Sequence, residues 1–276
     1  MMRIKALVEN TTVSKDYKCM HGLSLYIETR KHKILFDLGP GKLFYENARK
    51  MNINIEDVDT VVISHGHNDH GGALKIFLDY NKKAKVYLSD TAFEDYFFRV
   101  LGFNAYIGLD KALKNNNQIV LTGDHMMIDD ELQLFSKITE RSYLPSMDNK
   151  LYQKVGKQYQ KDAFQHEQSL LIKENGMYTL FAGCAHTGIV NILEKAEMIA
   201  GSQIRTVIGG FHLFHLPFKK EESHRYLEEL AKKLKEKNTV FYTCHCTGEK
   251  PYELLHKLMG AQIEYLSTGG SIEANA

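Results

Sequence analysis

The sequence predicts a mixed α/β protein in which two β-sheets pack together with helices on their outer faces, a four-layer αββα sandwich. Three observations support this prediction. The first third is rich in strand patterns, strands alternate with helices in the last third, and a polar, aromatic segment at about residues 101–165 separates them. Periodicity by itself indicates only an α/β protein with mixed sheets. The order of the strands and helices along the chain is what predicts the four layers.

The first third is expected to hold short strands that end at polar or glycine-containing turns. A helix is expected over residues 41–52, because Leu43, Phe44 and Ala48 fall on one helical stripe. Residues 60–64 are apolar and β-branched, as in a strand covered on both faces. The other elements expected here are strands at 2–8, 23–29, 32–39 and 85–89 and a helix at 71–80.

The middle segment, about 101–165, is expected to contain strands and an irregular insertion that serves as a lid or an oligomer contact. A hairpin about the turn ENG is expected at 169–183. No repeat, low-complexity stretch or linker interrupts the sequence, so we expect a single domain over residues 1–276. The remaining elements are helices at 187–200, 220–237 and 249–259 and strands at 205–210, 239–243 and 262–267.

Composition narrows the class of function. A net charge of +1 gives no electrostatic case for nucleic acid or a membrane surface. No apolar stretch approaches the ~20 residues of a membrane helix, and the N-terminus lacks the apolar core of a signal peptide. Four cysteines are too few for a disulfide scaffold in 276 residues. We therefore expect a cytoplasmic protein that acts on a small molecule. Its only expected protein partner is a second copy of the same chain.

The stretch SHGHNDHGG places four ligand-type side chains directly after an apolar strand: His65, His67, Asp69 and His70. Imidazole and carboxylate groups suit zinc, iron and manganese. In a turning loop His65 and His67 can aim at one ion, while Asp69 and His70 point toward a second. The alternative is an exposed polar loop without function, which this density of ligands after a buried strand disfavours.

Two later histidines also follow apolar strands. His245 lies in TVFYTCHCTG, and His212 follows two glycines in VIGGFHL, where the backbone can pass close to a site. His245 is a candidate metal ligand, with a buried neutral histidine as the alternative. His212 is a candidate ligand, substrate contact or general acid.

ILFDLG followed by SHGHNDHGG resembles the metallo-β-lactamase superfamily over nearly the whole chain. The resemblance implies an αββα fold and two metal ions bridged by hydroxide. It implies that Asp37 supports the site and that His65 and His67 share one ion with a later histidine. It also implies that Asp69 and His70 bind the second ion together with His245.

The later histidine is predicted to be His186, in GCAHTG, with His166 as the alternative. GCAH opens a helix after a buried strand, the same arrangement as in the first loop, whereas His166 borders the polar insertion. Members of the superfamily usually have a bridging aspartate after the hairpin. Cys184 stands at that position, so the sequence departs from the common pattern.

A narrower resemblance is to the subgroup that includes an archaeal dihydropterin–ribofuranosylaminobenzene phosphate synthase. It is carried by HGLSLYIET, EQSLLI, GCAHTGIVNIL, GGFHL and HCTG. This narrower resemblance implies transfer of a dihydropterin from its diphosphate to an arylamine. The chemistry of two divalent ions supports another activity, hydrolysis of a phosphoester, lactone or related bond by a metal-bound hydroxide.

For hydrolysis we expect two divalent ions, zinc foremost and iron or manganese as alternatives. The expected ligands are His65, His67, Asp69, His70, His186 and His245. Asp69 would also accept a proton, and His212 would orient or protonate the substrate. The third hypothesis is a metal-bound sensor or oligomer module without catalysis.

Overall fold

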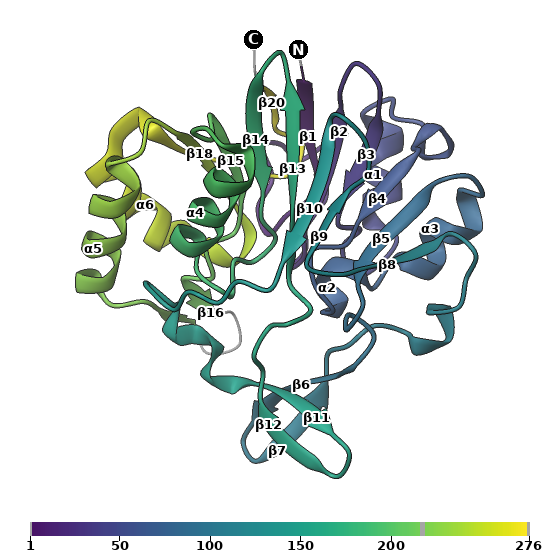
Figure 1. The fold of residues 1–276 in the computed structure, drawn as a ribbon, viewed down its shortest axis with the longest axis horizontal. Coiled ribbons are helices and arrows are strands. Elements are labelled where there is room, and N and C mark those ends of the chain that lie inside the picture. The colour runs from purple at the N-terminus through teal and green to yellow at the C-terminus, as the bar shows by residue number, and fades with distance from the viewer. Residues whose placement is uncertain (1, 216–218, 275–276) are drawn as a thin grey trace.

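The computed structural model describes residues 2–215 and 219–274. Two seven-stranded sheets face each other at the centre of the molecule (Figure 1). The first has the order β20-β1-β2-β3-β4-β5-β8 and the second the order β19-β18-β15-β14-β13-β10-β9. The strands of the first sheet are β1 (Met2–Val8), β2 (Ser24–Glu28), β3 (Lys33–Phe36), β4 (Thr60–Val62), β5 (Lys85–Ser89), β8 (Ile119–Thr122) and β20 (Ser271–Ala274). Those of the second are β9 (His125–Met127), β10 (Leu132–Ser136), β13 (Gln168–Glu174), β14 (Met177–Phe181), β15 (Thr206–Gly209), β18 (Val240–Thr243) and β19 (Ile263–Tyr265).

Helices cover the outer face of each sheet. On the first sheet α1 (Leu43–Lys50) and α3 (Leu74–Tyr80) bury Phe44 and Phe77 against strand residues such as Val61. On the second, α4 (Ile189–Ala200), α5 (His224–Lys235) and α6 (Glu249–Met259) bury their apolar stripes. A third apolar cluster lies between the sheets, where Phe36 packs at a ring-centroid distance of 5.8 Å from Phe181. The predicted αββα sandwich is therefore confirmed.

A separate four-stranded sheet projects from one end of the sandwich (Figure 1). Its order is β12-β11-β6-β7, built from β6 (Asp95–Val100), β7 (Phe103–Tyr106), β11 (Leu151–Val155) and β12 (Gln158–Lys161). We call it the projecting sheet. It differs from the expected insertion at 101–165, because it begins at Asp95 and because residues 119–136 return to the sandwich as β8, β9 and β10.

The last strand was also not expected. β20 pairs antiparallel with β1 at the edge of the first sheet, so the end of the described chain returns to its beginning. Its sequence, SIEA, is too short and polar to stand out by periodicity.

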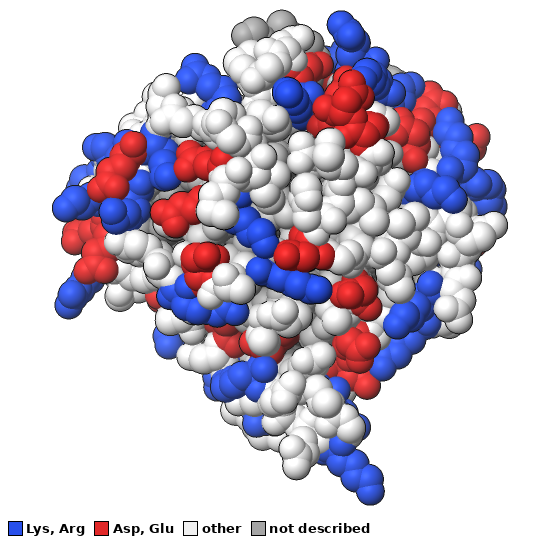
Figure 2. Space-filling view, viewed as in Figure 1, with Lys and Arg blue, Asp and Glu red and all other residues white. Residues whose placement is uncertain are grey.

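Charges of both signs are interspersed on the face seen in Figure 2. Lys31 lies 2.6 Å from Asp130, and Lys195 lies 3.0 Å from Asp124. Over the residues that the structure describes, no helix is both long and apolar enough to span a bilayer.

Candidate metal centre

The predicted site residues lie beyond the carboxyl ends of strands in both sheets. β3 and β4 run parallel in the first sheet, and β14, β15 and β18 run parallel in the second. Parallel strands present their carboxyl ends at one edge, and the loops that follow them meet there. The loops carry Asp37, His65 to His70, Cys184 to His186, His212 and His245.

His65, His67 and His186 form the first group. Their ring centroids lie 4.5 Å (His65–His67), 4.9 Å (His65–His186) and 5.3 Å (His67–His186) apart. The Nε2 atom of each ring is buried and has no hydrogen-bond partner among the described residues. Buried polar atoms are rarely left unpaired, so three of them in adjacent rings indicate a site that can bind a metal ion.

The protonation of these rings suits metal binding. His65 Nδ1 donates to Ser64 Oγ at 2.9 Å, and His186 Nδ1 donates to Asp148 Oδ1 at 2.6 Å, which leaves each Nε2 with its lone pair. Burial lowers the pKa of His67 to about 3 and holds the pKa values of His65 and His186 well below their usual range. Neutral imidazole is the form that binds metal.

Asp69, His70 and His245 form the second group. His70 Nε2 lies 3.2 Å from His245 Nε2, and Asp69 Oδ2 lies 3.7 Å from the first and 3.4 Å from the second. His70 Nδ1 donates to Asp37 Oδ2 at 2.6 Å, and His245 Nδ1 donates to Asn10 Oδ1 at 3.0 Å. Both rings therefore turn Nε2 toward Asp69.

Asp69 is ionised in this environment. Burial alone would raise its pKa, but His70, His21 and His245 outweigh burial and hold the pKa well below its usual range. The second group thus combines one carboxylate with two imidazoles, a donor set typical of divalent transition metals.

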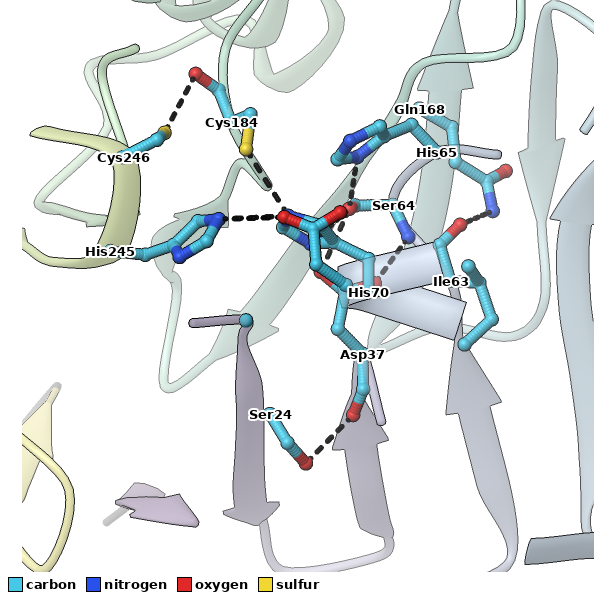
Figure 3. Close-up of polar contacts among 12 residues, drawn as sticks. Ser24, Asp37, Ile63, Ser64, His65, His70, Gln168, Cys184, His245 and Cys246 are labelled. Carbon is cyan, nitrogen blue, oxygen red and sulfur yellow. Dashed lines mark hydrogen bonds and ion pairs between the residues drawn. The ribbon is translucent and has the colours of Figure 1, made fainter. Parts of the chain in front are cut away.

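Cys184 lies between the two groups, with Sγ 3.1 Å from His70 Nε2 (Figure 3). Its Sγ belongs to two compact ligand sets, one with His65 and His186 and one with His70 and His245, in each of which all ligand atoms lie within 4.8 Å of one another. The Cys184 thiol is therefore within reach of both groups. Thiolate is a soft ligand that favours zinc over manganese.

His166 lies outside both groups. Its Nδ1 accepts a hydrogen bond from the Gly66 amide at 2.8 Å, so the proton resides on Nε2, which faces Asp162 Oδ2 at 3.0 Å. Both ring nitrogens are therefore in use. The contrast with the free Nε2 of His186 favours His186 as the third histidine of the first group.

His212 lies beside the first group, with its ring centroid 4.3 Å from that of His186. Its Nε2 is 3.1 Å from Asp148 Oδ1, and its backbone N–H donates to Cys246 Sγ at 3.3 Å. Burial lowers the pKa of His212, but the charge of Asp148 outweighs burial and the pKa rises to about 9. Burial also raises the pKa of Asp148 well above its usual range, so the Asp148–His212 pair retains a proton next to the candidate ligands.

Sequence reasoning missed carboxylates that support these histidines, among them Asp148 and Glu9. Asp148 contacts His186 and His212 as described. Glu9 is fully buried, and its Oε1 accepts from the His245 amide and from the Tyr265 hydroxyl, each at 2.7 Å. Glu9 belongs to no recognisable sequence motif, and Asp148 lies in a segment without hydrophobic periodicity. The sequence around each residue therefore gives no sign of a role in the site.

A cavity of about 240 Å³ opens onto both groups. Its polar lining includes His21, His67, Asp69, His186, His212 and His245. Its apolar lining includes Phe98, Ala105 and Leu151 of the projecting sheet. A small molecule bound here would contact both the histidines and the projecting sheet.

Comparison with known proteins identifies the family. Residues 17–139 match the profile of the metallo-beta-lactamase superfamily. An uncharacterised protein of Methanocaldococcus jannaschii is 32% identical over 262 residues, which cover 92% of this chain and 94% of that protein. This chain belongs to the metallo-β-lactamase superfamily.

Two further relatives span the whole length. The crystal structure of Tm1679, described as a metal-dependent hydrolase of this superfamily, matches with a TM-score of 0.84 and 26% identity over 100% of both chains. The 7,8-dihydropterin-6-methyl-4-(β-D-ribofuranosyl)-aminobenzene-5'-phosphate synthase of Methanocaldococcus jannaschii is 27% identical over 287 residues, 95% of each chain. The metallo-β-lactamase fold implies divalent metal binding, and the unpartnered Nε2 atoms of His65, His67 and His186 fit such an ion.

Proposed function

We propose that the protein is a metal-dependent hydrolase with two divalent ions in one centre. His65, His67 and His186 would hold the first ion, and Asp69, His70 and His245 the second. Cys184 would lie between the two ions. The observation that carries this proposal is the set of three buried Nε2 atoms without a hydrogen-bond partner among the described residues, in rings whose centroids lie 4.5 to 5.3 Å apart.

When bound, a pair of divalent ions would polarise a substrate oxygen and lower the pKa of water toward neutrality. The residues of the chain would do the rest. Asp69 is ionised and lines the cavity, so it can accept a proton there. The Asp148–His212 pair retains a proton, and His212 Nδ1 has no hydrogen-bond partner among the described side chains and backbone, so His212 can donate to a substrate oxygen.

The cavity indicates the class of substrate. Its volume of about 240 Å³ suits a small molecule or one end of a larger one. The polar lining suits an anionic or carbonyl oxygen, and the apolar lining with Phe98 and Leu151 suits a flat apolar group. A phosphoester, lactone or thioester that carries a ring system matches both linings.

A second candidate is transfer of a dihydropterin to an arylamine. The alignment with the archaeal synthase over 95% of each chain favours it. The apolar lining would stack on a flat ring, and the ions would neutralise a leaving diphosphate. In this reaction the cavity must keep water out, whereas a hydrolase must admit it.

Metal analysis followed by activity assays tests these candidates. The purified, metal-replete protein is expected to hold two transition ions per chain, and a chain without metal would refute both reactions. Phosphodiesters, lactones and thioesters are then assayed beside a dihydropterin diphosphate mixed with an arylamine. Hydrolysis of one of the first three supports the hydrolase, and a coupled pterin–arylamine product supports the transferase. Two bound ions with neither activity would favour a sensor or oligomer module.

A further inference from the structure

Asp148 reaches the candidate metal centre from outside the strand-end loops. It lies in the short helix η3 (Ser146–Lys150), directly before β11 of the projecting sheet. Its Oδ1 is 2.6 Å from His186 Nδ1 and 3.1 Å from His212 Nε2. One carboxylate oxygen therefore contacts a candidate ligand and the candidate proton donor at once.

We propose that Asp148 is a positioning residue of the metal centre. It fixes His186 in the tautomer that leaves Nε2 free for the ion, and it orients His212 beside that ion. This role rests on the proposed two-metal function. It means that the segment leading into the projecting sheet helps to hold the ligands of the centre in place. A carboxylate behind a metal-binding histidine sets the direction and basicity of the ring.

Two other histidines of the centre are held by residues at the strand ends of the first sheet. Ser64 holds His65 and lies beside it in the chain, and Asp37 holds His70 from the end of β3. His186 differs, because its partner Asp148 lies in η3, directly before the projecting sheet. Without Asp148, no other described residue is within hydrogen-bond distance of His186 Nδ1.

The segment that carries Asp148 is anchored to the helices of the second sheet. The backbone N–H and hydroxyl of Ser146 donate to Glu222, the hydroxyl contact being 2.9 Å. Tyr226 Oη donates to the carbonyl of Tyr143 at 2.7 Å. These contacts keep Asp148 over His186, because they fix the chain on its N-terminal side.

The chain directly after the β11–β12 hairpin also contacts His186. Phe164 follows β12 and stacks on the His186 ring, with a centroid distance of 4.3 Å and an interplanar angle of 5°. Asp148 before the hairpin thus fixes the rotation of the ring through Nδ1, and Phe164 after the hairpin covers its face. The segments before and after the hairpin therefore contact the same imidazole ring.

Titration of the metal-free protein with Co²⁺ and Zn²⁺ tests the inference. Asp148→Ala is expected to bind the first ion about 10- to 100-fold more weakly, the loss typical for a partner of a metal-binding histidine. It should also change the visible spectrum of the Co²⁺ form. Asp148→Asn keeps an acceptor for His186 Nδ1, so its loss should be smaller. Asp95→Asn is the control, because Asp95 lies on the projecting sheet and pairs with Lys111 at 2.6 Å.

The outcomes separate this inference from the proposed function. Wild-type protein that binds no ion would overturn the proposed function and this inference with it. Wild-type protein that binds two ions, with Asp148→Ala equal to it in affinity and spectrum, would overturn the role of Asp148 alone. If Asp148→Ala does not fold, Asp148→Asn decides, since an affinity equal to that of Asp95→Asn would overturn the role.

Discussion

Asp37 Oδ2 lies 2.6 Å from His70 Nδ1, and both side chains are completely buried. The same carboxylate accepts from the amide and the hydroxyl of Ser64, at 2.7 and 2.8 Å. Asp37 follows β3, whereas Ser64 lies in the loop after β4 and His70 in the short helix α2 (Asn68–Gly71) that this loop leads into. One carboxylate thus ties the two strand ends together and turns His70 Nε2 toward Asp69 and His245.

Replacing Asp37 with asparagine is predicted to weaken both the fold and the second ion site. Asp37 has a φ of 61°, a conformation that asparagine tolerates, so the backbone should not cause the effect. Without metal the pKa of His70 is raised to about 9, despite its burial, by the charges of Asp37 and Asp69. Removing one partner of a buried ion pair costs about 3–5 kcal/mol. Urea denaturation of the metal-free protein should show this loss, together with weaker binding of one ion.

A matched control is Asp79→Asn. Asp79 pairs with Lys75 at 2.8 Å on the surface of α3, with side-chain exposures of 60% and 65%. This variant should keep the wild-type free energy of unfolding and both ions. Equal stability of the Asp37 and Asp79 variants would contradict the role assigned to Asp37.

His67→Ala is predicted to remove the first ion and to abolish activity. His67 Nε2 is one of the three buried nitrogens of the first group that have no hydrogen-bond partner among the described residues, and the ion would lose a third of its imidazole ligands. Elemental analysis should find one ion per chain instead of two. His125→Ala should retain both, because His125 is exposed on β9 and contacts Gln133. Full activity of His67→Ala would mean that the reaction occurs elsewhere.

The candidate centre could be anticipated because its signals are local or lie at strand ends. Four ligand types within six residues, from His65 to His70, need no tertiary information to be noticed. His186 and His245 follow buried strands, and the structure brings both to the same edge of the sandwich as that loop. Asp148 could not be anticipated, because its segment has no period and its partner His186 is 38 residues away.

The fold was predictable to the level of layers and less so at the sheet edges. β8 and β9 are short strands with exposed or half-buried residues, so their pattern resembles that of the projecting sheet rather than a buried strand. Which sheet a short edge strand joins depends on the register of its neighbours, which the sequence does not reveal locally. The same reason explains why β20 was missed.

Cys184→Asp is predicted to change the preferred metal rather than to remove the centre. Cys184 Sγ lies between the two groups of ligands, where a carboxylate could also reach both. Replacing a soft thiolate with a hard carboxylate should shift the preference from zinc toward manganese. Competition between Zn²⁺ and Mn²⁺, followed by elemental analysis, measures the shift. Cys19→Ser is the control, since Cys19 is exposed, and a selectivity identical in the two variants would argue against a ligand role for Cys184.

His32 is predicted to make the stability of the sandwich depend on pH. Its Nδ1 lies 2.9 Å from Asp59, which precedes β4, and its Nε2 lies 2.7 Å from Asp129 in the turn between β9 and β10. Burial lowers the pKa of His32, but the hydrogen bond and charge of Asp59, with those of Asp129, outweigh burial and raise the pKa above 6.5. The charged ring therefore bridges the two sheets.

The sign of the effect follows from the raised pKa. The stabilisation is fully present below the unfolded-state pKa of about 6.5 and is lost as the pH rises through the higher folded-state pKa. His32→Gln should remove this component, so the variant loses more stability at about pH 6 than at about pH 9. Urea denaturation of the metal-free wild type and variant gives the difference between their free energies of unfolding at each pH. The other histidines titrate in both proteins, so their contribution cancels in this difference. Asp129→Asn should reproduce part of the effect, and a difference between wild type and His32→Gln that stays constant with pH would exclude the bridge as its source.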